Sequence, residues 1–196
     1  MQAILSRNVI EDYLSDANES MRIRFFLVNQ CAPVMKHLKP AQMLTLSKEC
    51  VKEMASLCQT WDLCYLNLYQ DTRKEVILIY REAEMLRFLG REKVLHLLEE
   101  KNYDISSFST MIHSLCEKME SFYKGVGKYP HEVGLFLGYP LEDVLGFMGE
   151  KQVKPLYRGY WVVYNDLNHA KNVFKKYDQA RRELLLRLLI DHHKTI

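Results

Sequence analysis

The segment from residue 129 to 144, YPHEVGLFLGYPLEDV, holds the densest group of side chains that could take part in chemistry. His131 and Glu132 stand next to each other, and an imidazole beside a carboxylate can transfer protons or bind a metal ion. Pro130 predicts a short helix over 131–137, because proline is favoured at a first helical position. The positive end of that helix would disfavour a charged imidazole, leaving a base or a metal ligand. We therefore predict that His131 and Glu132 line a pocket.

The acids of this segment also have a structural interpretation. Gly138 is expected in the left-handed conformation that ends a helix, and Pro140 at the start of a second helix over 141–149. Glu142 and Asp143 would then lie in the first turn of that helix, where its dipole stabilises negative charge. Because acids are common in first turns, capping and dipole stabilisation is the preferred interpretation.

The same window has the spacing of a helix-turn-helix, with Gly134, Gly138 and Val144 at the packing positions. Its second helix would present Glu142 and Asp143 to the phosphates of DNA, which repel them. The chain carries 27 Lys and Arg against 25 Asp and Glu, a net charge of +2, so it lacks a strong basic field. Nucleic acid is therefore a disfavoured partner, and a degenerate helix-turn-helix regulator stays an alternative.

Thiol chemistry depends on five cysteines, which are Cys31, Cys50, Cys58, Cys64 and Cys116. Cys31 precedes Ala32-Pro33 at a predicted helix break, and a thiol at the start of a new helix would gain thiolate character. An inert buried thiol is the preferred interpretation. The odd number of cysteines and the short, polar start from Met1 to Arg7 predict free thiols in the cytoplasm. No apolar run reaches the roughly 18–20 residues of a membrane span.

Complete catalytic signatures are missing from the sequence. His131-Glu132 lacks the second histidine of H-E-x-x-H because residue 135 is leucine, and no G-x-S-x-G, P-loop or G-x-G-x-x-G motif occurs. His113 and Cys116 could share a metal, but their apolar neighbours favour a buried thiol beside an exposed imidazole. We therefore predict no metal site and cannot name a cofactor.

The elements that position these residues follow from the hydrophobic pattern. Helices are predicted over 8–16, 21–30, 47–60, 82–89, 91–100, 105–123 and 167–190, and strands over 63–69, 76–80 and 159–164. This is an α+β fold, mainly helical, with a small antiparallel sheet of about three strands in a single domain over 1–196. The apolar end of the last helix, from Leu184 to Ile190, is a candidate homodimer contact.

The stretch from His131 to Val144 resembles the signature of domain-of-unknown-function family 3793, found largely in anaerobic, clostridia-like bacteria. Four shorter segments also match it: Cys31-Ala32-Pro33, Lys39-Pro40-Ala41, Ile79-Tyr80-Arg81 and Gly159-Tyr160-Trp161. The resemblance implies no particular activity. It marks as candidate ligand-binding residues Cys31, His131, Glu132, Tyr139, Asp143, Tyr160 and Trp161. Relatives often carry a cysteine before the Gly-Tyr-Trp segment and another in the last helix, and this chain has neither, which puts any function of those thiols in doubt here.

The absence of a complete catalytic constellation favours a cytoplasmic accessory protein that binds a small molecule or a protein partner without catalysis. A small enzyme, or a redox or metal-binding protein, with a pocket around Cys31 and His131 is the alternative from another class.

Overall fold

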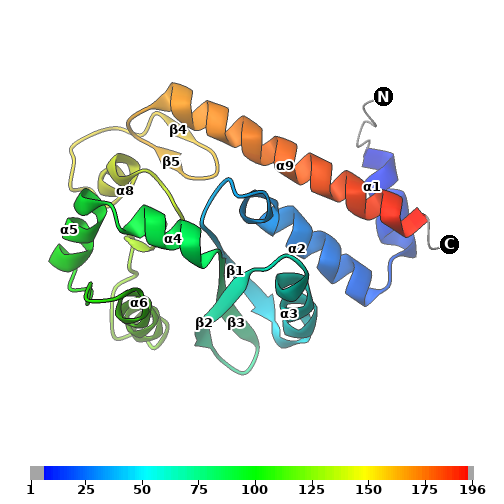
Figure 1. Ribbon diagram of the computed structural model, residues 1–196, viewed down its shortest axis with the longest axis horizontal. Coiled ribbons are helices and arrows are strands. Elements are labelled where there is room, and N and C mark those ends of the chain that lie inside the picture. The colour runs from blue at the N-terminus through cyan, green and yellow to red at the C-terminus, as the bar shows by residue number, and fades with distance from the viewer. Residues whose placement is uncertain (1–6, 194–196) are drawn as a thin grey trace.

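The computed structural model, which describes residues 7–193, is built around a three-stranded antiparallel sheet (Figure 1). The strand order is β1 (Ala41–Ser47), β3 (Lys74–Tyr80) and β2 (Cys64–Gln70). The hairpin of β2 and β3 was predicted, and Asp71 stabilises its turn by accepting hydrogen bonds from the backbone N–H groups of Arg73 and Lys74. The predicted α+β class is confirmed.

Helices cover both faces of the sheet, and the alternation of β3 divides the interior into two cores. Val76 and Leu78 point to one core, and Ile77 and Ile79 point to the other. The first core is closed by α4 (Glu82–Leu89), α5 (Glu92–Glu100), α6 (Phe108–Tyr123), α7 (Val133–Phe136) and α8 (Leu141–Phe147). The second core is closed by α2 (Glu19–Met35), the short 3-10 helix η1 (Lys48–Cys50), α3 (Val51–Thr60) and α9 (Leu167–His193). Figure 1 shows α9 running along the molecule from the hairpin of β4 (Tyr157–Arg158) and β5 (Val162–Val163) to α1 (Arg7–Asp16).

The third strand of the sheet is not the predicted one. Residues 159–164 do not join the sheet; β4 (Tyr157–Arg158) and β5 (Val162–Val163) form a separate hairpin instead. The chain turns at Gly159, where a Cβ atom would lie 2.2 Å from the ring of Phe174. The sheet is completed by β1, which lies where the sequence had no predicted element and precedes the helix expected to start at Ser47.

The predicted helix break at Ala32-Pro33 is also wrong. Pro33 lies inside the last turns of α2, which continues to Met35, and the N–H of Leu38 then donates to the Pro33 carbonyl at 2.8 Å. Cys31 is consequently in a continuous helix and not at the start of a new one.

Residues 1–6, on which the expectation of no signal peptide rests, lie outside the described residues, as do 194–196. No helix within the described part of the chain has the length and apolar character that crossing a bilayer requires. At the end of α9, Leu184, Leu185 and Leu189 are buried within the chain, while Ile190 is 47% exposed. The homodimer contact predicted there stays a prediction, with little apolar surface left to form it.

Candidate functional site

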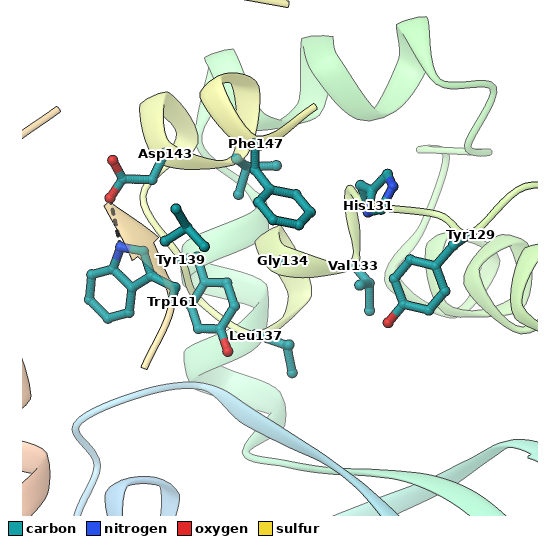
Figure 2. A pocket seen from close by; sticks show the side chains of 11 residues that line it. Tyr129, His131, Val133, Gly134, Leu137, Tyr139, Asp143, Phe147 and Trp161 are labelled. Carbon is teal, nitrogen blue, oxygen red and sulfur yellow. Dashed lines mark hydrogen bonds between the residues drawn. The ribbon is translucent and has the colours of Figure 1, made fainter. Parts of the chain in front are cut away.

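A cavity of about 230 Å³ lies between α7, α8 and β5 (Figure 2). Its walls are mainly aromatic and aliphatic and include Tyr129, Val133, Leu137, Tyr139, Val144, Phe147 and Trp161. This volume is below the roughly 300–1,000 Å³ of pockets for drug-sized molecules, so it suits a compact ligand. Figure 2 shows Phe147 and His131 on one side of the cavity and the hydroxyl groups of Tyr129 and Tyr139 directed to the opposite side.

Asp143, in the first turn of α8, forms part of the wall and is only 4% exposed. Its Oδ2 atom accepts a hydrogen bond of 2.7 Å from the indole N–H of Trp161. Its Oδ1 atom accepts bonds of 2.7 and 3.0 Å from the backbone N–H groups of Tyr164 and Asn165. Three donors hold the carboxylate in place, as a buried charge requires. Asp143 therefore fastens the chain around β5 to α8, which is more than the predicted dipole stabilisation.

Tyr139 and Trp161 form the aromatic end of the cavity, with stacked rings whose centroids are 5.4 Å apart. Burial raises the pKa of Tyr139 to about 12, so its hydroxyl stays protonated and can donate to a ligand. Gly134 allows this end to close, because a Cβ atom there would lie 3.0 Å from Val144 and 3.2 Å from Tyr139. A larger residue at position 134 would intrude on both walls.

His131 lies at the open side of the cavity, between the rings of Tyr129 and Phe147, with centroid distances of 5.3 and 5.2 Å. It is exposed, and no other described residue forms a hydrogen bond with its imidazole. α7 begins only at Val133 and has four residues, so it provides none of the helix dipole that we expected at His131. Both ring nitrogens are free to bind a ligand.

Glu132 does not share this cavity with His131. It is 7% exposed and lines a second cavity of about 430 Å³, together with Lys118 and Lys128. Tyr129 lines both cavities and separates them. The prediction that His131 and Glu132 line a single pocket is therefore wrong: the chain turns ahead of α7, and the two neighbouring side chains face different spaces.

Cys31 lies in the interior of the protein and not at either cavity. It is 0% exposed in the core between α2 and the sheet and lines neither cavity. Burial raises the pKa of its thiol to about 12, because a thiolate would be poorly solvated there. Cys31 is thus buried, as in our preferred interpretation, and the structure does not bring it together with His131.

Tyr160 also lies outside the cavity, although Trp161 beside it lines the wall. Its hydroxyl donates to Asp178 at 2.7 Å and accepts from Arg181 at 3.1 Å, which joins the hairpin to α9. Within residues 7–193, no group of three or more His, Cys, Asp or Glu side chains is placed to hold a metal ion.

Sequence reasoning missed the aromatic lining residues Tyr129 and Phe147 and the aliphatic ones Val133, Leu137 and Val162. Phe147 is 49% exposed at the end of α8, and its periodicity alone gives it no functional role. Its exposure and its contact with the ring of His131 become visible only in the structure. Tyr129 immediately precedes the Pro130-His131 segment and could have been identified by that position.

The family model described as "Protein of unknown function (DUF3793)" matches residues 27–194, a range that includes every residue of both cavities. No curated protein and no solved structure matches the chain significantly.

Proposed function

Because the chain belongs to the DUF3793 family of proteins of unknown function, we propose its function from the cavity itself. The protein binds a compact, uncharged, ring-shaped or aliphatic molecule in the cavity between α7, α8 and β5. It does so as a cytoplasmic accessory protein of an anaerobic bacterium, without catalysis. The observation that carries this proposal is an apolar cavity with one unbonded imidazole, that of His131, at its mouth.

The charges of the wall favour a neutral ligand over an anion. No lysine or arginine is among the described residues that line the cavity. Asp143, which carries the one carboxylate among those described lining residues, already accepts three hydrogen bonds. An anion would lose its hydration without gaining a cation, which is costly. A neutral ring gains from aromatic contacts, and His131 and the Tyr139 hydroxyl can orient one polar substituent.

The absence of catalysis rests on the same side chains. A general base must reach the proton that it removes, and the Asp143 carboxylate already accepts three hydrogen bonds that hold it in the wall. Among the described lining residues, His131 has free ring nitrogens, and none is a serine, threonine, cysteine or lysine. Two alternatives remain: an enzyme or metal-binding protein that uses Cys31 and His131, and a regulator that uses residues 131–149. No specific observation favours either of them.

Fluorescence of Trp161 can test the proposal directly. The chain has two tryptophans, so Trp61→Phe leaves Trp161 in the cavity wall as the only indole reporter. We would titrate this variant with phenol, benzylamine and benzoate, which present a similar ring with no charge, a positive charge or a negative charge. Phenol should give a saturable change and bind at least about tenfold more tightly than benzoate, a difference of about 1.4 kcal/mol.

Two substitutions of exposed phenylalanines provide the matched comparison. Phe147→Ala removes one wall and should weaken phenol binding, whereas Phe26→Ala, at a 40% exposed position on α2 outside the cavity, should leave it unchanged. A titration that does not saturate with any of the three probes would contradict the proposal. If Phe147→Ala instead disrupts a complex with another protein, the cavity accepts a side chain of a partner and not a small molecule.

A further inference from the structure

A basic and partly apolar surface lies at the end of the molecule where the β4–β5 hairpin meets α9. Figure 1 shows this hairpin beside the first turns of α9, and the loop that follows α8 leads into it. Residues 149–182 hold eight lysines and arginines against three acids, a local charge of +5 in a chain whose net charge is +2. The positive charge of the protein is therefore concentrated in this segment.

Three of these cations form a row along one side of α9. Lys171, Lys175 and Arg182 are spaced by four and then seven residues, so the helical period places them on the same side. The ammonium of Lys171 lies 5.8 Å from the centre of the Tyr157 ring, which joins the row to the hairpin. All three are exposed, and the side chains of Lys175 and Arg182 form no hydrogen bond or ion pair with any other described residue.

The acids of the same segment do not neutralise this row. Each of the three forms a bond elsewhere in the chain: Glu150 with Lys101, Asp166 with the backbone N–H of His169, and Asp178 with Tyr160 and Arg181. The row therefore keeps a positive field that can attract an anionic partner.

Apolar side chains protrude beside the row. Val153, Leu156 and Tyr157 are 46%, 51% and 45% exposed, and residues 152–156 form neither helix nor strand. None of these three described residues lines either of the cavities above, so no groove surrounds them that could hold a peptide. Nucleic acid offers little to a protruding aliphatic side chain. A bilayer accepts such side chains below its head groups, while its anionic lipids attract lysine and arginine.

We propose that this surface holds the protein on a bilayer that contains anionic lipids. Val153 and Leu156 enter the boundary between head groups and acyl chains, and Tyr157 lies at the level of the head groups, where tyrosine is favoured. The row on α9 contacts the lipid phosphates. A protein that lies on a membrane in this way needs no spanning helix. The association is independent of the cavity between α7, α8 and β5, because no residue that carries it lines that cavity.

Co-sedimentation of the full chain with lipid vesicles tests this proposal. Vesicles of phosphatidylcholine alone are compared with vesicles of equal parts phosphatidylcholine and phosphatidylglycerol, which is anionic. Binding to the mixed vesicles should be at least about tenfold tighter. It should decrease steeply as the salt concentration approaches about 1 M, where the Debye length is about 3 Å.

Two pairs of matched variants separate the charge of the row from the charge of the whole chain. Lys171→Gln combined with Lys175→Gln should weaken binding to the mixed vesicles at least about tenfold, because each lysine near an anionic surface contributes to the attraction. Lys48→Gln combined with Lys52→Gln removes the same charge from exposed positions in η1 and α3, and should leave binding unchanged.

A second pair of variants tests the apolar contact. Val153→Ser should weaken binding to the mixed vesicles, whereas Val126→Ser, at an 84% exposed position after α6, should leave it unchanged. All the substituted side chains are exposed or half-exposed, and thermal unfolding of each variant checks that it is folded.

The proposal is overturned if the protein sediments equally with both kinds of vesicle or with neither. It is also overturned if the Lys48 and Lys52 variant loses as much binding as the Lys171 and Lys175 variant, since net charge alone would then explain the attraction. If Val153→Ser binds vesicles as the parent does, and single-stranded RNA displaces the vesicles, the row binds phosphates of nucleic acid and the membrane assignment is wrong.

Discussion

The indole nitrogen of Trp161 donates a hydrogen bond of 2.7 Å to the carboxylate of Asp143, across 18 residues of sequence. The other carboxylate oxygen accepts from the backbone of the residues that follow β5. Trp161 also packs edge-on against Phe174 of α9, with ring centroids 4.5 Å apart. One buried acid therefore holds together α8, the β4–β5 hairpin and, through the indole, α9. The shape of the cavity between α7, α8 and β5 depends on this connection.

Asp143→Asn should destabilise the protein by about 2–3 kcal/mol. The substitution replaces one carboxylate oxygen by an NH₂ group, which cannot accept a hydrogen bond from the N–H donors that the oxygen now binds. Urea unfolding measures the loss, and the Trp161 fluorescence should shift to the red as the indole meets water. In a Trp161→Phe background the same substitution should cost less, since one of the donors is already gone. Losses that simply add would show that the two side chains do not interact.

Gly138→Ala should cost more stability than Gly149→Ala, although both glycines have a left-handed backbone. Their φ angles are 78° and 77°. At Gly149 a Cβ atom meets nothing within 4 Å, so only the backbone conformation is penalised, by about 1–2 kcal/mol. At Gly138 the Cβ atom would also lie 2.3 Å from Cδ of Pro40, which adds about 1–3 kcal/mol of overpacking. Denaturant unfolding of both variants gives the comparison, and equal losses would exclude a role for the Gly138–Pro40 contact.

The parts of the fold that sequence could predict are those specified by local periodicity. The apolar face of α6 and the buried run Val76–Ile79 each indicate their structure without reference to other segments. β1 could not be identified in this way, because Met43, Leu44 and Leu46 suit a helix as well as a strand. It is a strand because it pairs with β3 along its whole length, with Leu44 opposite Ile77.

Four of the candidate residues line one cavity, namely His131, Tyr139, Asp143 and Trp161, whereas Cys31, Glu132 and Tyr160 do not. Residue type and helix position had singled out His131, Glu132 and Asp143 without showing how they lie relative to one another. Whether neighbouring side chains share a space depends on how the chain turns before α7, and sequence spacing does not contain that information. The role of Asp143 depends on a tryptophan that only the tertiary fold brings beside it.

Cysteine reactivity should follow burial, with Cys64 modified first. Cys64 is exposed, whereas Cys31 and Cys58 are buried and have pKa values raised by burial to about 12 and about 11. Only thiolates react, so iodoacetamide should modify Cys31 and Cys58 in the native protein at least about a hundredfold more slowly than Cys64. Mass spectrometry of peptides after timed labelling measures the order. Rapid native labelling of Cys31 would mean that α2 opens readily and that the thiol is available for chemistry after all.

Lys39 should make the stability of the protein rise with pH above about 8. The side chain is 5% exposed, its ammonium donates to the Gln42 side chain at 3.0 Å, and burial lowers its pKa from 10.5 to about 8. Below pH 8 the folded and unfolded states both carry the charge, and the folded state bears the full cost of burying it. Between pH 8 and 10.5 the unfolded state binds more protons, so stability increases with pH. The difference in pKa corresponds to about 3 kcal/mol.

Comparison with Lys39→Met isolates this contribution from the other groups that titrate in the same range. Cys31 acts in the opposite direction, because its raised pKa makes the unfolded thiol ionise first and lowers stability above pH 9. That effect is present in both proteins and is largely removed by subtraction. Methionine keeps the apolar stem and loses the charge, so the variant should be more stable than the parent at pH 7. The lost hydrogen bond to Gln42 offsets part of this gain in stability. Urea unfolding between pH 7 and 10.5 should show this advantage shrinking by about 3 kcal/mol as Lys39 deprotonates. An advantage that does not change with pH would mean that the folded state keeps Lys39 charged throughout, and that burial does not lower its pKa.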